Sequence, residues 1–131
     1  MPVGLPWGGV CVVGRGKDNA LITYEYQPFR GWRTDEIPAA AGGAIVGDPV
    51  AVALGAEAHV VARGRNGNVL HFERTKGGWS AGDLTTACAG TEPVVGSPVL
   101  LVHDSRLHVF ARTRGDRLLH LERTEDGQWE G

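Results

Sequence analysis

Short apolar runs separated by turn residues recur along the chain. In its middle third they occupy residues 50–54, 58–62 and 68–73, and the last run is rich in the β-branched and aromatic residues that favour strands. Asn66-Gly67 lies between two of these runs, and because both residues tolerate a positive φ the dipeptide predicts a tight hairpin. No stretch keeps an apolar period of 3.6 residues long enough for a helix. The pattern predicts an all-β protein.

The same pattern repeats with a period of 49 residues. Residues 47–75 and 96–124 are identical at 13 of 29 positions without a gap. A more diverged copy opens the chain, where Arg15 aligns with Arg63 and Glu25 with Glu73. We expect a single domain of three modules, with approximate bounds 1–46, 47–95 and 96–131. Each module must stack on its neighbours because one such unit cannot bury its own apolar surface.

Each module continues into a second turn, a tryptophan and a fourth run, as in residues 79–84. Four short antiparallel strands in about 50 residues, with a tryptophan near the last strand, are typical of a β-propeller blade. Propellers usually need about four to eight blades to close a ring. Three blades therefore predict a homo-oligomer, with six blades in a dimer, unless the chain is a piece of a longer protein. The third module lacks a counterpart of residues 82–90, so its outer strand should be short or missing.

Composition and charge exclude several classes of function. The 20 glycines and 7 prolines suit many turns, and a hydrophobic share of 42% is enough for a packed core. A formal net charge of −2 gives no general attraction to phosphate backbones, so nucleic acid is not an expected partner. The sequence has no apolar span long enough to predict a membrane segment. The first residues do not resemble a signal peptide, so we expect a cytoplasmic protein or one released by a non-classical route.

Cofactor and metal signatures are also missing from the sequence. Cys11 and Cys88 do not correspond between modules and have no metal-ligand spacing, which argues against zinc or redox chemistry. There is no nucleophile elbow, zinc-protease helix or phosphate loop. We therefore expect neither a cofactor nor a metal, and no enzymatic activity.

The polar and aromatic residues that recur at fixed places are the candidate ligand-binding residues. They are Trp32, Trp79 and Trp129; Arg15, Arg63 and Arg112; Glu25, Glu73 and Glu122; and His71 and His120. An indole face can stack on the C–H surface of a pyranose, while an arginine and a carboxylate presented together can bind vicinal hydroxyls. The alternatives are structural: tryptophans that fill the space between blades, inter-blade or cross-strand ion pairs, and histidines with a merely polar role.

Several runs of the third module, repeated in the second, carry a resemblance to a known family. They are Gly96-Ser-Pro-Val99, Leu107-His-Val-Phe-Ala-Arg112, Leu118-Leu-His120 and Gly127-Gln-Trp129. With them the chain resembles the bacterial and fungal β-propeller lectins that bind fucose and O-methylated glycans. It is also similar to smaller fucose lectins in which two-blade chains trimerise into a six-bladed ring. The resemblance implies an Arg, a Glu and a Trp per sugar site, with the Arg placed where this chain has His59 and His108.

These observations favour a non-catalytic, lectin-like protein that binds fucose-like or O-methylated sugars at repeated pockets between blades. Two alternatives stay open. One is a propeller scaffold for protein–protein interaction, in which the repeated residues are purely structural. The other, with less support, is an enzyme whose site lies in the central channel or at a subunit junction and uses non-repeated groups such as Glu57, His103 or Asp104.

Overall fold

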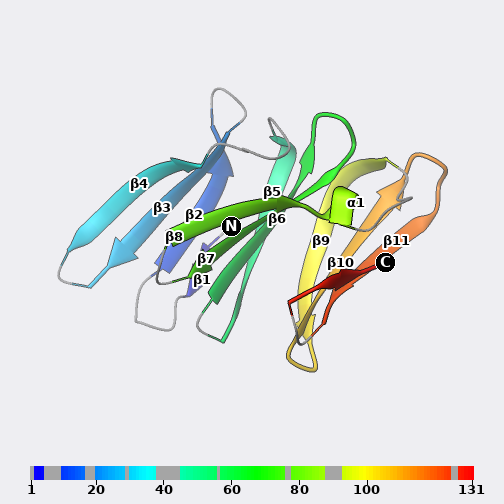
Figure 1. The fold of residues 1–131 in the computed structure, drawn as a ribbon. Coiled ribbons are helices and arrows are strands. Elements are labelled where there is room, and N and C mark those ends of the chain that lie inside the picture. Colours follow the sequence, from blue (N-terminus) through cyan, green and yellow to red (C-terminus); the bar gives the residue numbers. More distant parts are fainter. Residues whose placement is uncertain are drawn as a thin grey trace.

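The computed structural model describes residues 2–4, 10–16, 20–28, 30–37, 45–55, 57–75, 78–87, 93–124 and 127–131. Three four-stranded antiparallel sheets lie side by side in chain order, like the blades of a fan (Figure 1). Within every sheet the strands follow one another in sequence order, so all connections are local. This confirms the all-β, three-blade prediction.

The strands of the first blade are β1 (Pro2–Gly4), β2 (Val10–Arg15), β3 (Leu21–Gln27) and β4 (Gly31–Ile37). Those of the second blade are β5 (Ile45–Leu54), β6 (Glu57–Gly64), β7 (Val69–Thr75) and β8 (Gly78–Asp83). Those of the third blade are β9 (Val94–His103), β10 (Arg106–Thr113), β11 (Leu118–Arg123) and β12 (Trp129–Glu130). The outermost strand of the third blade has only two residues, as the missing sequence counterpart of 82–90 predicted.

The hairpin between β6 and β7 forms, but its turn is not the one expected from Asn66-Gly67. The Gly67 N–H donates to the Gly64 carbonyl at 3.1 Å, and only Gly67 takes a positive φ, of 81°. The loop is thus an ordinary β-turn followed by one left-handed residue, and Asn66 keeps a negative φ. A turn with positive φ at both central residues occurs instead at Asp104-Ser105, which join β9 and β10.

The middle blade presents a different apolar face to each neighbour, because successive side chains of a strand point to opposite sides. Val60, Leu70 and Phe72 belong to the cluster shared with the first blade, whereas Val61 and Val69 belong to the cluster shared with the third. All five side chains are buried. The core is therefore not one central volume but two layers between stacked blades, and groups near these layers are held between two sheets.

The fourth run of the middle module ends one residue earlier than expected. β8 stops at Asp83, and Leu84 begins the single turn of helix α1 (Leu84–Ala87). Asp83 caps this turn, since its Oδ1 accepts the Thr85 N–H at 2.9 Å. Leu84 itself is buried against the third blade. Among the described residues, no helix has the length and apolar character needed to cross a membrane.

Candidate functional site

Two histidines lie stacked at the junction between the second and third blades. His59 on β6 faces Glu73 across the hairpin and His71 on β7 faces Val61, so the two rings meet diagonally on one face of the sheet. Their planes differ by 9° and the His59 Nδ1 lies 3.0 Å from the His71 Nε2. From the third blade Trp129 sets its ring edge-on to His71, at a centroid distance of 5.2 Å. The junction thus places an indole beside a buried imidazole pair.

Both imidazoles are held in the neutral form. Burial, with smaller contributions from His59 and Arg123, lowers the pKa of His71 to about 3. Burial also lowers the pKa of His59, and the positive charge of Arg123 acts in the same direction. Two neutral rings can share one N–H donor and one acceptor lone pair across the 3.0 Å contact. The pair therefore offers hydrogen-bonding groups without adding charge at neutral pH.

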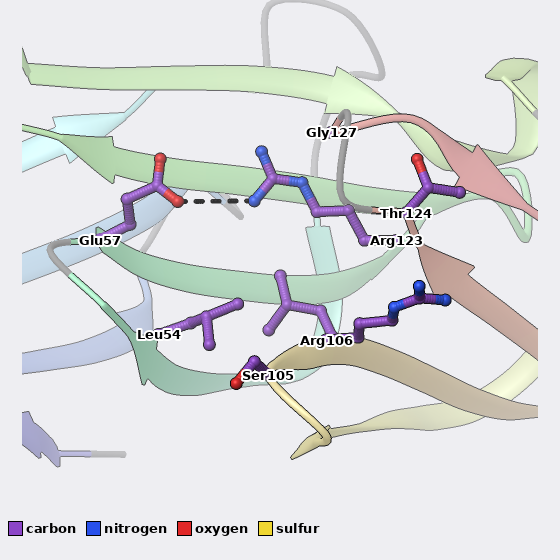
Figure 2. Close-up of a pocket in the computed structure, with 8 residues that line it drawn as sticks. Leu54, Glu57, Ser105, Arg106, Arg123, Thr124 and Gly127 are labelled. Carbon is purple, nitrogen blue, oxygen red and sulfur yellow. Dashed lines mark hydrogen bonds and ion pairs between the residues drawn. The ribbon is translucent and has the colours of Figure 1, made fainter.

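Arg123 extends from β11 of the third blade into the second blade and binds two carboxylates there. Its Nη1 lies 3.5 Å from the Glu57 Oε1 and its Nη2 lies 3.3 Å from the Glu73 Oε1. Figure 2 shows the contact with Glu57. A hydrogen bond between the two carboxyl groups lowers the pKa of Glu57 and raises that of Glu73. Through these contacts the guanidinium of Arg123 and the two carboxyl groups link the second and third blades.

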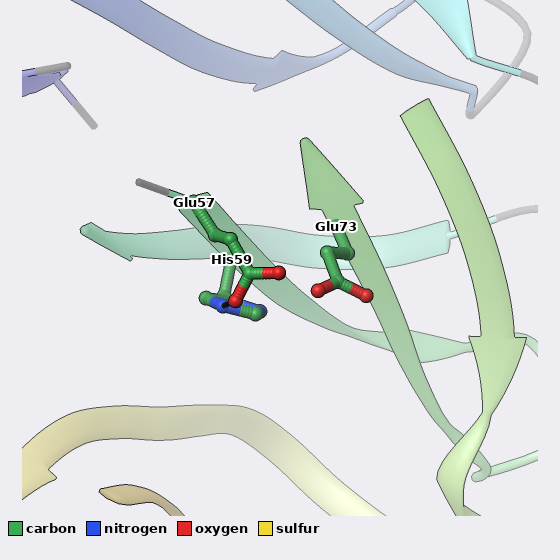
Figure 3. A group of neighbouring side chains, drawn as sticks. All are labelled: Glu57, His59 and Glu73. Atoms are coloured by element: carbon green, nitrogen blue, oxygen red, sulfur yellow. Dashed lines mark ion pairs between the residues drawn. The ribbon is translucent and has the colours of Figure 1, made fainter. Parts of the chain in front are cut away.

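Glu57, His59 and Glu73 also form a compact set of metal-type donors, drawn in Figure 3. Their ligand atoms lie within 4.8 Å of one another, and carboxylate and imidazole are ligands that zinc accepts. The guanidinium of Arg123 already binds both carboxylates from the neighbouring blade. A cation could use this set only if Arg123 moved away, so the arrangement as it stands is an ion-pair network.

Two cavities open at the same junction. One, of about 310 Å³, is lined by His71, Glu73, Asp83, Arg123 and Trp129 among others, so aromatic, basic and acidic groups from both blades surround it. The other, of about 360 Å³, is shown in Figure 2 and is also lined in part by Arg123. Cavities of this size suit a small ligand. The first combines an indole with hydrogen-bonding groups and is the candidate binding site.

The junction between the first and second blades repeats the ion pair but not the histidines. Arg74 Nη2 lies 3.3 Å from the Glu25 Oε2, in the same relation as Arg123 to Glu73. Cys11 and Thr23 stand at the register positions of His59 and His71, and both are 1% exposed. Burial, followed by the charge of Glu25, raises the pKa of the Cys11 thiol to about 11. At the two positions that correspond to the histidines, this junction therefore has small buried side chains.

The third blade repeats the histidine pair on its outward face. His108 Nδ1 lies 3.0 Å from the His120 Nε2, and the rings are parallel within 6°. Phe110 also stacks on the imidazole ring of His120, with the two ring centroids 4.7 Å apart. Glu122 accepts from Arg106 of its own blade at 3.2 Å. Within the described chain this set has no further blade against it, and His120 is exposed.

The arginine and glutamate that recur in each module do not meet, contrary to expectation. Arg63 faces Val69 next to the turn of the β6–β7 hairpin, whereas Glu73 faces His59 at its open end. Four residues of strand separate the two positions, roughly 13 Å. The same register holds in the other blades for Arg15 with Glu25 and for Arg112 with Glu122. Arg15 and Arg112 are exposed.

The three recurring tryptophans have three different environments. Trp79 packs against the core between the first two blades, and Trp129 against the core between the last two. Trp32 is 64% exposed on the outer strand of the first blade, where its ring centroid lies 5.5 Å from that of Tyr26. The register is nevertheless the same, because Tyr26, Arg74 and Arg123 each face the tryptophan of their own blade.

Sequence reasoning missed the two arginines that pair with the glutamates, Arg74 and Arg123. Both follow directly after the glutamate of their own blade but bind the glutamate of the preceding blade. The repeated run Glu-Arg-Thr was the available signal. It indicates alternating faces: the glutamate points to one neighbouring blade and the arginine to the other.

Stacked four-stranded blades define a β-propeller fold, and a polar, aromatic cavity lies between the second and third blades. No family model and no curated protein sequence matches the chain. Among solved structures it is similar to a fucose lectin from Kordia zhangzhouensis in complex with methyl-fucoside, at 14% identity and a TM-score of 0.67, covering 98% of this chain and 95% of that one.

It is also similar to a mutant of the Aleuria aurantia lectin in complex with alpha-methyl-L-fucoside, at 18% identity and a TM-score of 0.66. This match covers 98% of the present chain but 43% of that lectin, so the chain spans less than half of its length. At these identities the likeness establishes the fold. The chain therefore has the blade architecture of the propeller lectins.

Proposed function

We propose that the protein is a non-catalytic lectin that binds fucose-like or O-methylated sugars at the cavity between its second and third blades. The observation that carries the proposal is the lining of this 310 Å³ cavity by Trp129 together with His71, Glu73 and Arg123. The two solved structures of the same fold hold fucosides. An indole beside polar groups is what a monosaccharide requires.

The electrostatics suit a neutral sugar. Arg123 is balanced by the pair Glu57 and Glu73, and burial keeps His59 and His71 uncharged. Sugar hydroxyls can then exchange hydrogen bonds with these fixed partners. The methyl group of a deoxy or O-methylated sugar can pack against the apolar face of Trp129. A volume near the lower end of ligand pockets, about 300 Å³, favours one sugar residue over a long chain.

We also propose that copies of the chain assemble, with two copies giving a ring of six blades. In the part of the chain that the structure describes, one face of the first blade and one face of the third have no neighbouring blade. Each sugar site should be weak alone, and assembly would raise the overall affinity for a glycan surface by about 10²–10⁴ through avidity.

Binding of methyl-fucoside and O-methylated fucose, measured by calorimetry, tests the proposal. Trp129→Ala should weaken binding at this cavity about tenfold, which corresponds to about 1.4 kcal/mol of lost stacking. The control is Arg65→Ala, in the exposed turn between β6 and β7, which should bind sugar like the wild type. Circular dichroism must show that both variants fold.

A folded wild-type protein that binds no sugar on a glycan array would refute the lectin proposal. Capture of one protein in fixed stoichiometry, unaffected by competing sugars, would instead favour the interaction scaffold. Turnover of a sugar substrate that depends on Glu57 would favour an enzyme.

A further inference from the structure

We infer that Glu57, His59 and Glu73 form a binding site for one divalent transition-metal ion of the zinc class, which enters by displacing the guanidinium of Arg123. The site lies beside the cavity proposed for the sugar, and it does not depend on sugar binding. From the sequence we expected no metal, because these donors come together only across the β6–β7 hairpin.

The three donors converge on one positive charge that comes from the third blade. The Arg123 Nη1 lies 3.5 Å from both the Glu57 Oε1 and the His59 Nε2. The Arg123 Nη2 lies 3.3 Å from the Glu73 Oε1. Two carboxyl groups and an imidazole this close together favour a cation among them. A divalent ion balances two carboxylates, whereas a guanidinium balances one.

The spacing of the donors suits a small ion. Zinc bonds of about 2.0–2.2 Å in a tetrahedral site place neighbouring donor atoms about 3.4 Å apart. The Glu57 Oε1 and the His59 Nε2 are already 3.3 Å apart, and the donor atoms of all three residues lie within 4.8 Å of one another (Figure 3). A small shift of the carboxylates therefore completes the ligand set without movement of the strands.

The imidazole of His59 is oriented for metal binding through its Nε2. The side chain is 0% exposed, and its Nδ1 lies 3.0 Å from the His71 Nε2. When a metal takes the His59 Nε2, the ring carries its N–H on Nδ1 and donates it to His71. Metal-binding histidines almost always donate their second N–H to such a partner, which fixes the ring. The histidine pair thus supplies a ligand together with the group that orients it.

Arg123 can be displaced from the centre of this set. Its contacts, at 3.3 and 3.5 Å, are longer than the roughly 2.7–2.9 Å of strong charge-assisted hydrogen bonds. Its Nε is buried and has no hydrogen-bond acceptor among the described residues. The 360 Å³ cavity is lined by both Glu57 and Arg123, so it provides room for the displaced guanidinium and a path for the ion (Figure 2).

The third blade shows how the second blade departs from the repeat. Arg106 stands 49 residues after Glu57 and pairs with Glu122 at 3.2 Å, so this blade supplies its own cation. His108 faces the same Glu122 across the hairpin. In the second blade an acid replaces the arginine and creates the third ligand. Within the described chain, three metal-type donors meet in this blade alone.

The ligand types select a transition metal over calcium or magnesium. Calcium takes about six to eight oxygen ligands and magnesium demands an octahedral set, whereas this site offers two carboxylates and a nitrogen. Imidazole suits zinc and its neighbours in the transition series. Three protein ligands leave one tetrahedral position for water.

Calorimetric titration of the intact protein with Zn²⁺ alone tests the site. The wild type should bind one ion per chain at this set. Arg123→Met removes the competing cation and should bind Zn²⁺ at least about tenfold more tightly. The matched control is Arg65→Met, in the exposed β6–β7 turn, which should titrate like the wild type. A wild type that binds no Zn²⁺, or an Arg123→Met variant that binds it no more tightly, would overturn the inference.

Removal of one ligand should abolish the gain. Glu73→Gln, added to Arg123→Met, keeps the shape of the side chain and should lower the Zn²⁺ affinity by more than about 100-fold, since even the partners that orient a ligand are worth about 10–100-fold. Zn²⁺ should also raise the urea midpoint of Arg123→Met but not that of the double variant. Circular dichroism must show that both proteins fold. Equal Zn²⁺ affinities would contradict the assignment.

Histidines on the third blade are the alternative location for the ion. His103 and His120 are exposed there, and His108 lies between them in the chain. Zn²⁺ binding that is lost in His120→Ala and retained in Glu73→Gln would place the ion on that surface and overturn the inference. Nitrogen NMR of the imidazoles identifies the ligand directly. The His59 Nε2 resonance should shift in the Zn²⁺-loaded protein, and bound Zn²⁺ without this shift would exclude the proposed site.

Discussion

Removing Arg123 should weaken the contact between the second and third blades and lower the free energy of unfolding. Each of its two contacts, at 3.3 and 3.5 Å, corresponds to about 5 kcal/mol of attraction at an effective dielectric constant near 20, most of which is offset by desolvation. Breaking a buried pair by deleting one partner costs about 3–5 kcal/mol. Because the three side chains keep exposures of 18–33%, we expect Arg123→Met to cost about 2 kcal/mol.

Urea unfolding at one fixed protein concentration measures this loss. With a slope of about 2 kcal/mol per molar urea, the midpoint should fall by about 1 M. Arg112→Met is the matched control, because its ion pair with Asp116, at 3.9 Å, joins two strongly exposed groups and should contribute almost nothing. Equal midpoints for the two variants at neutral pH would refute the reasoning.

The pH dependence of the same variant provides a second readout. Without the guanidinium, Glu57 and Glu73 face each other as like charges, so the folded state should bind a proton at this pair more tightly than the unfolded chain does. A raised folded pKa gives stability at low pH that is lost as the pH rises through that pKa. The deficit of Arg123→Met should therefore shrink as the pH falls from 7 toward 5. A deficit that grows on acidification would contradict this.

Three further predictions concern the buried groups. The pKa of His71 is lowered to about 3, so the unfolded chain binds more protons than the folded chain between pH 6.5 and 3. As the pH falls through this window, the free energy of unfolding should decrease by up to about 1.4 kcal/mol per pH unit. In urea titrations His71→Gln should show a flatter dependence of stability on pH. Phe72→Ala, fully buried between the first two blades, should cost about 3–5 kcal/mol in thermal unfolding, against less than about 1 kcal/mol for the exposed Val102→Ala. In a Cys88→Ser variant, Cys11 should react with a thiol reagent at pH 8 only on unfolding, because it is buried and its pKa is raised to about 11; rapid labelling of the folded protein would contradict the structure.

The blades could be predicted from the sequence because their determinants are local. Short apolar runs and turn residues specify the strands, and the repeat of residues 47–75 at 96–124 indicates stacked units. The type of turn at Asn66 could not be predicted from the sequence, since its dihedral angles depend on the loop length and on the packing of Gly67 near Pro93. The brief helix at Leu84 is likewise fixed by burial and by the Asp83 cap.

The candidate site was predictable only in part. Repetition pointed to Glu73 and Trp129, but not to their partner, because Arg123 is 50 residues away and meets Glu73 only when two blades stack. Hairpin register then separates Arg63 from Glu73. The histidines illustrate the remaining difficulty. His71 and His120 recur identically in sequence, yet one is enclosed and the other is exposed.

Among the described strands, the middle blade packs against a neighbour on both faces, whereas each end blade packs against a neighbour on one. Such a stack behaves as a chain of nearest-neighbour units, in which opening can start at either end and spread inward. Amide hydrogens of β6 and β7 should therefore exchange with solvent most slowly, and those of β3 and β11 faster. If copies join end to end, the gradient should flatten, because the outer blades then acquire the neighbours that protect the central one.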